Sequence, residues 1–489
     1  MTAARERLSA LTRLTLIEAC EAVRNGEITS VALTEAALGA FKAGDPTINS
    51  SITLDGEEAL QTAARLDRLR KNGRLLGPLH GVPLAHKDMY YRAGKPCTCG
   101  SKIRGTFRPA YTATAIKRLE DAGSITIGSL NMAEFAQNPT GHNAHFGNCH
   151  NPWHVDHCTG GSSSGSGAAV AARFVCGALG SDTGGSIRLP ATMCGVTGIK
   201  GTQTRVSRYG AMPLCFSADN VGPLARTAHD CARLLRTIAG HDPADPTSSI
   251  EPVPDYEAEL DGDVRGLRIG VPTNYFFDGA DPEVQAAFDI ALQVLESRGA
   301  RIVRLEIPHI DAVNTYASIV SRVEGATIHA QWMRERPHDY SIHLGGRLYA
   351  GYAIPAVHYV EALSRRGPIL RALGSDVFGK VDVFATPTIR MKVPTLAATD
   401  IDAGAPGAIE AFGAITANTR VINYMGLPSV SLPCGFDSKG LPIGFQIQGR
   451  PFAEARVLKI AHAFQQDTDW HTRVPELSSV KALESAAES

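Results

Sequence analysis

Short apolar segments with strand character alternate with amphipathic helical segments along most of this chain. Residues 82–86, 124–127 and 267–271 are predicted strands, and residues 113–122 form a predicted helix between the first two. Further strands are predicted at residues 301–305, 381–385, 429–432 and 443–448. Such alternation is typical of an α/β fold, in which a mixed sheet carries helices on both faces.

Two parts of the chain differ from this pattern. Residues 1–75 are predicted to form a helical segment that packs on the core, because apolar side chains recur there at helical spacing. Residues 76–476 are assigned to the α/β domain. Within that domain, residues 313–379 have a weak strand signal and are predicted to be a helical insertion near the mouth of the site. Residues 477–489 are predicted to be a flexible tail.

Composition and charge exclude several classes of protein. The 489 residues carry a net charge of −1, which argues against binding to nucleic acid. The longest apolar stretch, residues 168–179, is too short to span a bilayer and is interrupted by Arg173. The start of the chain is polar, so no signal peptide is predicted. Ten scattered cysteines in such a chain indicate reduced thiols and a cytoplasmic location.

Three polar motifs carry the residue types that nucleophilic catalysis needs. Ser186 lies in the segment GSDTGGSIRLP, residues 180–190, directly after two glycines that leave neighbouring N–H groups uncovered. Lys87 ends a predicted apolar strand, where loss of solvation would lower its pKa and favour the neutral amine. Ser162 lies in the turn TGGSSSGSG, residues 159–167. Each motif alone is weak, but together they predict a nucleophile with its base.

These motifs resemble the amidase signature family over nearly the whole chain. The resemblance is densest at residues 160–201, where GGSSSGS, GSDTGGSIR and CGVTGIK occur in the order found in the family. It implies the amidase signature fold, an α/β fold with a central mixed, mostly parallel twisted β-sheet covered by helices on both faces. It also implies hydrolysis of a carbon–nitrogen amide bond, with no metal and no organic cofactor.

The resemblance further implies a role for each motif. Ser186 would be the nucleophile, Lys87 the base, and Ser162 the bridging serine, held by a cis peptide bond after Gly161. These roles are chemically consistent, because a neutral amine can take up a proton through a hydroxyl group that both donates and accepts. The N–H groups of the oxyanion hole would come from Thr183, Gly184, Gly185 and Ser186.

Other interpretations of these segments are weaker. The sequence GSSSG at residues 161–165 matches the nucleophile elbow of α/β-hydrolases, but residues 151–158 are too polar for the strand that must precede an elbow. The cysteines and histidines between residues 149 and 158 do not follow a standard zinc spacing, so no metal site is predicted. A non-catalytic scaffold is disfavoured because all three triad residues are present. His86 either lowers the pKa of Lys87 or packs within its strand.

The substrate is less well defined by the sequence. Parts of the chain are similar to the glutamine-hydrolysing subunit of tRNA-dependent amidotransferases, in which an arginine matching Arg347 binds a carboxylate. Thr416 stands where those subunits carry an amine-binding aspartate, and an unpaired buried ammonium is costly. A stand-alone amidase is therefore favoured over a glutaminase subunit, and its substrate is expected to be a small amide, anilide, ester or carbamate. The resemblance to the family also implies a homodimer. The candidate substrate-binding residues are Gln137, Asn138, Thr140, Ile187, Cys194, Arg347 and Tyr349.

Overall fold

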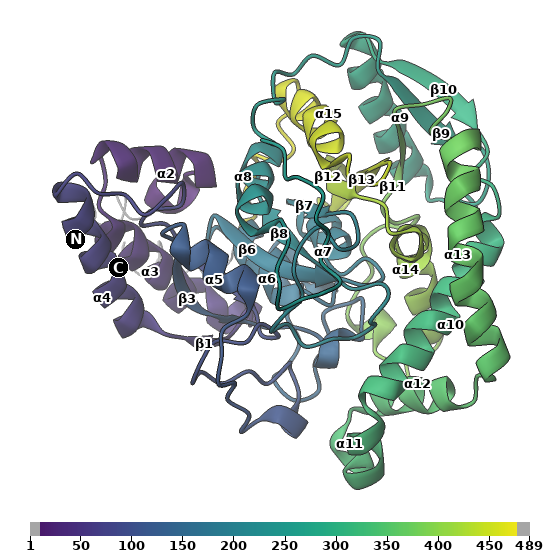
Figure 1. The fold of residues 1–489 in the computed structure, drawn as a ribbon, viewed down its shortest axis with the longest axis horizontal. Coiled ribbons are helices and arrows are strands. Elements are labelled where there is room, and N and C mark those ends of the chain that lie inside the picture. Colours follow the sequence, from purple (N-terminus) through teal and green to yellow (C-terminus); the bar gives the residue numbers. More distant parts are fainter. Residues whose placement is uncertain (1–9, 477–489) are drawn as a thin grey trace.

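The N-terminal helices gather at one edge of the molecule (Figure 1). A computed structural model of the chain describes residues 10–476. Helix α2 spans Leu16–Asn25, α3 spans Ser30–Ile48 and α4 spans Gly56–Lys71. The side chains of Thr15 and Thr29 begin α2 and α3 by accepting hydrogen bonds from free backbone N–H groups in the first turn. Helices thus occupy most of residues 16–71.

One sheet of eleven strands runs through the described part of the chain. In spatial order its strands are β1 Ser51–Leu54, β3 Ile125–Leu130, β2 Pro83–Lys87, β6 Gly177–Asp182, β8 Asn220–Ala225, β7 Thr197–Lys200, β12 Ser429–Phe436, β13 Pro442–Gly449, β11 Val383–Pro387, β9 Arg268–Pro272 and β10 Arg301–Leu305. Parallel pairing occurs in two blocks, β3-β2-β6 and β11-β9-β10. Antiparallel pairing joins these blocks through β8, β7, β12 and β13, and attaches β1 to β3.

Helices cover both faces of this sheet. The middle strands are buried at nearly every position, as a sheet covered on both sides requires. In one layer α8, α15 and α9 pack against the sheet, α15 contacts both α8 and α9, and α5 contacts α8. These helices span Ala228–Ile238 (α8), Glu454–Gln466 (α15), Pro282–Ser297 (α9) and Thr114–Asp121 (α5). The other layer contains α6 Ser164–Ala171, α7 Arg188–Cys194 and α14 Ala408–Met425. The predicted α/β fold with a mixed central sheet is confirmed.

The segment between β10 and β11 is helical and stands along one side of the molecule, in green in Figure 1. It consists of α10 Ile310–Ile328, α11 Ala330–Glu335, α12 Ile342–Tyr352 and α13 Ala356–Asp376. Helix α10 packs against α12, α13 and α14, which connects this segment to the sheet domain. The division of the chain into domains remains a prediction, and the predicted tail at residues 477–489 lies outside the described residues.

A short hairpin precedes the Ser/Gly-rich turn. Strands β4, His150–Asn151, and β5, His154–Cys158, form a separate two-stranded antiparallel sheet. The expectation that residues 151–158 are too polar for a strand is therefore wrong. Polar residues are tolerated here because β5 is exposed along its first half, and Asn151 donates from its side chain to the Cys158 carbonyl at 2.8 Å. The hairpin lies outside the main sheet, so the turn does not follow a central strand as a nucleophile elbow does.

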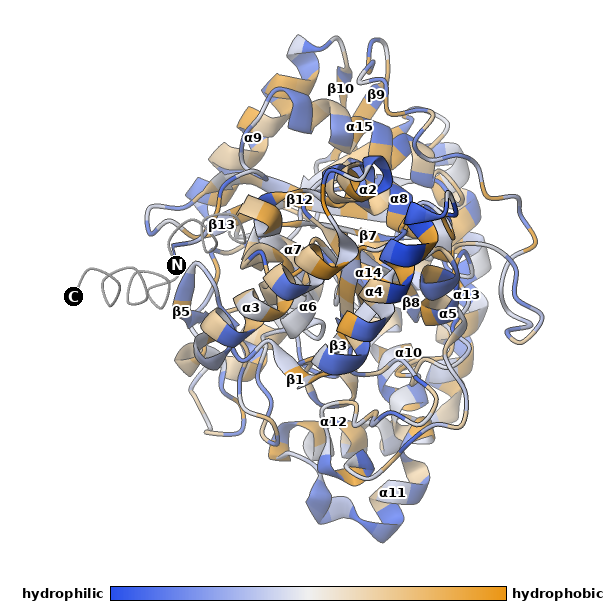
Figure 2. Cartoon of the chain, turned by 90° about the vertical axis from the view of Figure 1, so that its left-hand side faces the viewer, coloured by the Kyte–Doolittle hydropathy of each residue, from blue (hydrophilic) through white to orange (hydrophobic). Residues whose placement is uncertain are grey.

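The outer helices are amphipathic, as the hydropathy colouring of Figure 2 shows. In α9, for example, the apolar side chains Val284, Phe288, Leu292 and Leu295 are buried against the sheet. All ten cysteines are free thiols, and only Cys176 is not fully buried. Within residues 10–476, no helix has both the length and the apolar character needed to cross a membrane.

Candidate active site

The carboxyl end of β2 places Lys87 in the interior of the protein. Its side chain is almost inaccessible, and Nζ lies 2.7 Å from Ser162 Oγ and 2.9 Å from Ser181 Oγ. Burial removes water from the ammonium group and lowers the pKa of Lys87 from 10.5 to about 7, although the charges of Asp182 and Asp219 act in the opposite direction. A large fraction of Lys87 is therefore neutral near pH 7 and able to accept a proton.

The turn that precedes α6 carries Ser162. The peptide bond between Gly161 and Ser162 is cis, and the carbonyl of the fully buried Ser162 accepts the Ala133 N–H at 3.1 Å. No side chain fits at Gly161, because a Cβ there would lie 2.4 Å from the carbonyl oxygen of Asn138. This close packing holds Ser162 Oγ beside Lys87 Nζ.

The loop that follows β6 carries Ser186 on the wall of the main cavity. Gly185 has a φ of +127°, and a Cβ there would lie 2.3 Å from Thr419 Oγ1, so the loop requires glycine at this position. The Ser186 carbonyl accepts the Ser163 N–H at 3.3 Å, which joins this loop to the turn carrying Ser162. This backbone hydrogen bond brings the two segments together, but among the described residues the hydroxyl groups of Ser186 and Ser162 are not hydrogen-bonded to each other.

Asp182 fixes the shape of the Ser186 loop. Its carboxylate accepts the N–H of Gly185 at 2.9 Å and that of Ile187 at 3.2 Å, and it is paired with the Arg188 guanidinium at 3.0 Å. Burial alone would raise the pKa of Asp182, but the Arg188 charge holds it at about 2. The Gly185 N–H is thus already bonded. The other predicted oxyanion donors are the backbone N–H groups of Thr183, Gly184 and Ser186. Among the described residues, these N–H groups have no backbone acceptor.

The main cavity has a volume of about 370 Å³ and lies between this loop and helices α10, α12, α13 and α14. Three of the predicted substrate-binding residues, Gln137, Asn138 and Arg347, line it. Arg347 donates from Nε to Gln137 Oε1 at 2.8 Å, so these two side chains form one polar wall. Thr183, Gly184 and Ser186 contribute to the same cavity.

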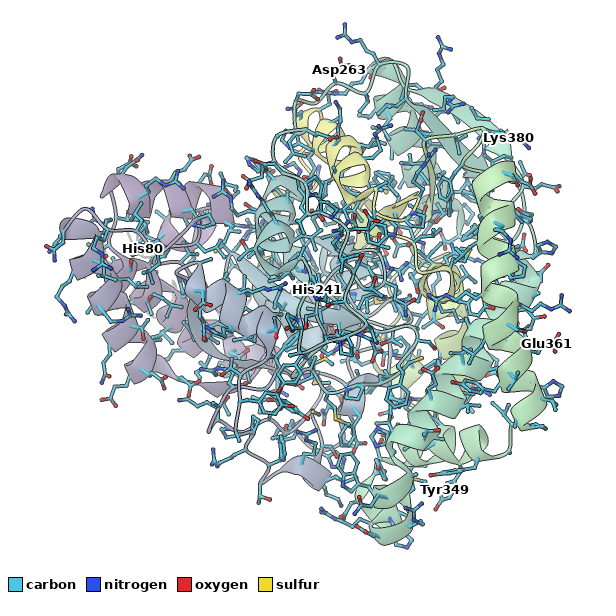
Figure 3. The ribbon with its side chains drawn as sticks, viewed as in Figure 1. His80, His241, Asp263, Tyr349, Glu361 and Lys380 are labelled. Atoms are coloured by element: carbon cyan, nitrogen blue, oxygen red, sulfur yellow. The ribbon has the colours of Figure 1, made fainter. Side chains whose placement is uncertain are left out.

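The other four predicted substrate-binding residues do not line this cavity. Thr140 turns its hydroxyl to Asn138 Oδ1 and to His142 Nδ1, and Ile187 packs in an apolar cluster with α6. Cys194 is buried and donates from Sγ to the Thr159 carbonyl at 3.2 Å. Tyr349, on α12, has 56% of its surface exposed. Figure 3 labels it near the lower edge of the molecule. Assigning these four residues to the cavity wall is therefore wrong.

Sequence reasoning missed Ser181, the second hydroxyl group that contacts Lys87. Ser181 lies on β6, which pairs with β2, and it occurs within the motif that carries Ser186. Its place in that motif was the available signal. Three cavity arginines were also missed, and no local pattern distinguishes them from surface residues: Arg322, Arg366 and Arg420.

His86 is a packed strand residue. Its Nδ1 accepts the Leu179 N–H at 3.2 Å, and burial lowers the pKa of His86 to about 3. A neutral ring adds no positive charge next to Lys87, so burial rather than His86 explains the low pKa of the lysine. Within residues 10–476, no group of three or more histidine, cysteine, aspartate or glutamate residues is placed to hold a metal ion.

Comparison with known proteins identifies the family of this chain. The family model described as Amidase matches residues 32–458. A glutamyl-tRNA(Gln) amidotransferase subunit of Chloroflexus aggregans is 42% identical over 489 aligned residues, which cover 95% of this chain and 98% of that protein.

Two solved structures are also similar. One is described as part of a vestigial protein complex that reveals the evolutionary origins of an s-triazine catabolic enzyme; it is 32% identical with a TM-score of 0.86 and covers 95% of this chain and 100% of its own. The native peptide amidase from Stenotrophomonas maltophilia is 29% identical with a TM-score of 0.79 and covers 95% of this chain and 98% of its own. Members of the family hydrolyse carbon–nitrogen amide bonds. The chain belongs to the amidase signature family.

Proposed function

We propose that this chain hydrolyses small linear amides through an acyl-enzyme formed on Ser186. The observation that carries the proposal is the 2.7 Å contact between Lys87 Nζ and Ser162 Oγ, in an interior where burial lowers the pKa of Lys87 to about 7. A neutral amine within hydrogen-bond distance of a relaying hydroxyl is the base that a serine nucleophile needs. No step requires a metal or an organic cofactor.

The proposed proton route runs from Ser186 through Ser162 to Lys87, and the contact between Ser162 and Lys87 supports its second step. Substrate binding turns the Ser186 hydroxyl toward Ser162, and Ser186 Oγ attacks the amide carbonyl carbon while its proton passes to Ser162 Oγ and a proton passes from Ser162 to Lys87 Nζ. Collapse of the tetrahedral intermediate breaks the C–N bond, and the proton on Lys87 returns through Ser162 to the leaving nitrogen. Water then attacks the acyl ester by the same route and releases the carboxylic acid.

The loop that carries Ser186 would bind the oxyanion of this intermediate. We assign this role to the N–H groups of Thr183, Gly184 and Ser186, which have no backbone acceptor among the described residues. Each such donor contributes about 2.7–4 kcal/mol to stabilisation of the transition state. Gly185 is left out of the set because its N–H is bonded to Asp182 at 2.9 Å.

A stand-alone amidase is favoured over a glutaminase subunit, the second candidate. The names of curated relatives such as the Chloroflexus aggregans protein favour the subunit. The cavity favours the solitary enzyme, because no aspartate or glutamate is among the described residues that line it. Thr416 lines the cavity, and its hydroxyl donates to the Phe412 carbonyl at 3.1 Å within α14. The α-ammonium group of glutamine would thus enter without a counter-charge.

A product-release assay tests this function. The purified chain is offered a primary amide, an anilide, an ester, a carbamate and glutamine, and the kcat/KM for each is measured. Ser186→Ala should abolish turnover of every substrate that is cleaved, whereas Ser364→Ala, an exposed serine on α13, should not change it. Substantial turnover by Ser186→Ala would refute the nucleophile. Preference for glutamine together with a co-purifying partner would support the role in an amidotransferase.

Two proposals concern the protein in the cell: the scattered cysteines, taken as reduced thiols, support the first, and the resemblance to the family supports the second. We propose that it acts in the cytoplasm and that it forms a homodimer. Light scattering of the purified chain tests the second proposal, since the measured mass should be twice that of the chain. Binding to nucleic acid or to membranes is not part of the proposed function.

A further inference from the structure

Four arginines converge on the main cavity from four different helices. Arg322 comes from α10, Arg347 from α12, Arg366 from α13 and Arg420 from α14. No aspartate or glutamate is among the described residues that line the same cavity. The wall opposite Ser186 is therefore strongly cationic.

The hydrogen-bond partners of these arginines are uncharged. Arg347 donates to Gln137 Oε1 and to Ser321 Oγ, both at 2.8 Å. Arg420 donates from Nε to Asn314 Oδ1 at 2.6 Å. Within the described part of the chain, neither arginine forms an ion pair, and the same holds for Arg322 and Arg366. Neutral acceptors orient the guanidinium groups but leave their positive charge uncompensated.

The mutual effect of these charges is unfavourable. Burial, together with the positive charges of Arg322 and Arg420, lowers the pKa of Arg347 to about 10. Burial likewise lowers the pKa of Arg420, and the charge of Arg322 contributes. Cations held together without an anion cost free energy, and binding of an anion relieves that cost.

Glu324 is a buried carboxylate whose charge acts on one of these arginines, and it is already engaged. It lies buried behind the cavity wall, where it accepts the Ser217 N–H at 2.9 Å and the Tyr359 hydroxyl at 2.9 Å. Its charge acts on Arg366, which in turn donates to the Ser217 carbonyl at 2.7 Å. Arg366 is therefore part of the supporting wall, and the uncompensated charge resides on Arg322, Arg347 and Arg420.

We propose that the substrate is a monoamide whose acyl chain carries a carboxylate and no ammonium group, with the carboxylate bound by Arg322, Arg347 and Arg420. This substrate class rests on the proposed amide hydrolysis at Ser186. Planar guanidinium groups bind carboxylates through paired hydrogen bonds, and three of them around one cavity discriminate strongly against a neutral group. Apolar side chains line the space for the methylene groups between the carboxylate and the amide, and these include Leu214, Ala317, Val320 and Phe412.

Three matched compounds test the assignment. Glutaramate has an amide and a carboxylate, glutaramide replaces the carboxylate with a second amide, and glutamine adds an α-ammonium group to glutaramate. We expect kcat/KM for glutaramate to exceed that for each of the others by at least about tenfold. Arg347→Gln and Arg322→Gln should lower kcat/KM for glutaramate by a much larger factor than kcat/KM for glutaramide. Arg371→Gln, an exposed arginine on α13 outside the cavity, is the control.

Binding to the Ser186→Ala protein separates recognition from chemistry. Calorimetry on this variant should show glutaramate binding at least about tenfold more tightly than glutaramide, with the difference shrinking as salt is added. Equal binding of the two compounds, or equal losses in kcat/KM for both in the arginine variants, would overturn the carboxylate assignment. If neutral amides were still hydrolysed, the proposed function would stand. Tight binding of glutaramate without turnover of any amide would overturn the hydrolysis and the substrate assignment together.

Discussion

The acid limb of the pH–rate profile is the most direct readout of the Lys87 environment. The proposed relay works only when Lys87 is neutral, and burial lowers the pKa of Lys87 to about 7. About nine-tenths of Lys87 is then neutral at about pH 8, roughly one-tenth at about pH 6, and about one-hundredth at about pH 5. We therefore expect kcat/KM for a neutral primary amide to fall about 90-fold between about pH 8 and about pH 5.

The charge of Asp219 provides a matched perturbation of this limb. Asp219 lies near Lys87, and its negative charge raises the pKa of Lys87. Removing that charge in Asp219→Asn should move the acid limb to lower pH, whereas Asp376→Asn on the exposed side of α13 should leave it in place. Circular dichroism at each pH controls for acid unfolding. A profile that stays flat down to about pH 5, or a limb that Asp219→Asn moves to higher pH, would refute the lysine base.

Three further substitutions test other parts of the structure. Lys87→Met removes a side chain whose pKa is about 7 in the folded protein and 10.5 in water. Because the pKa is lower in the folded state, the free energy of unfolding of the wild-type protein should rise relative to that of the variant between about pH 7 and about pH 10. The expected slope in urea unfolding is about 1.4 kcal/mol per pH unit. Gly161→Ala places a Cβ 2.4 Å from the Asn138 carbonyl oxygen and should lower the free energy of unfolding by about 1–3 kcal/mol. The control Gly39→Ala, whose added Cβ meets no atom within 4 Å, should be neutral or stabilising. Equal stabilities of the two variants would contradict the close packing at the turn that carries Ser162. Thr416→Asp adds a carboxylate to the cavity wall and should raise kcat/KM for glutamine relative to that for glutaramate, because the α-ammonium group then has a counter-charge. If the ratio of the two kcat/KM values stays unchanged in the release assay, the missing counter-charge does not exclude glutamine.

The sequence predicts the catalytic part of the site better than the cavity wall. Lys87 was expected at the end of an apolar strand and Ser162 in a glycine-rich turn, and the structure brings their side chains within 2.7 Å. Both predictions depend on local features, namely strand burial and the small residues that allow a tight turn. Ser181 was missed because its contact with Lys87 depends on the pairing of β2 with β6, which periodicity alone does not give.

The cavity wall is built from helices that are far apart in the sequence. Arg347 and Tyr349 were both expected in it, but residues two apart on a helix are separated by about 200° and cannot face the same side. Helix α12 directs Arg347 to the cavity and Tyr349 outward. The gathering of Arg322 and Arg420 beside Arg347 is set by the packing of α10 and α14, so no local pattern could reveal it.

The two halves of this site are anchored to different parts of the fold. Lys87 and Ser181 lie on paired strands, and the loop held by Asp182 follows one of them, whereas α10, α12 and α13 supply much of the opposite wall. Substitutions on those helices can therefore change the substrate specificity without disturbing proton transfer. A scaffold divided in this way offers a natural starting point for directed evolution, in which libraries confined to α10, α12 and α13 would retain the chemistry while sampling new acyl groups.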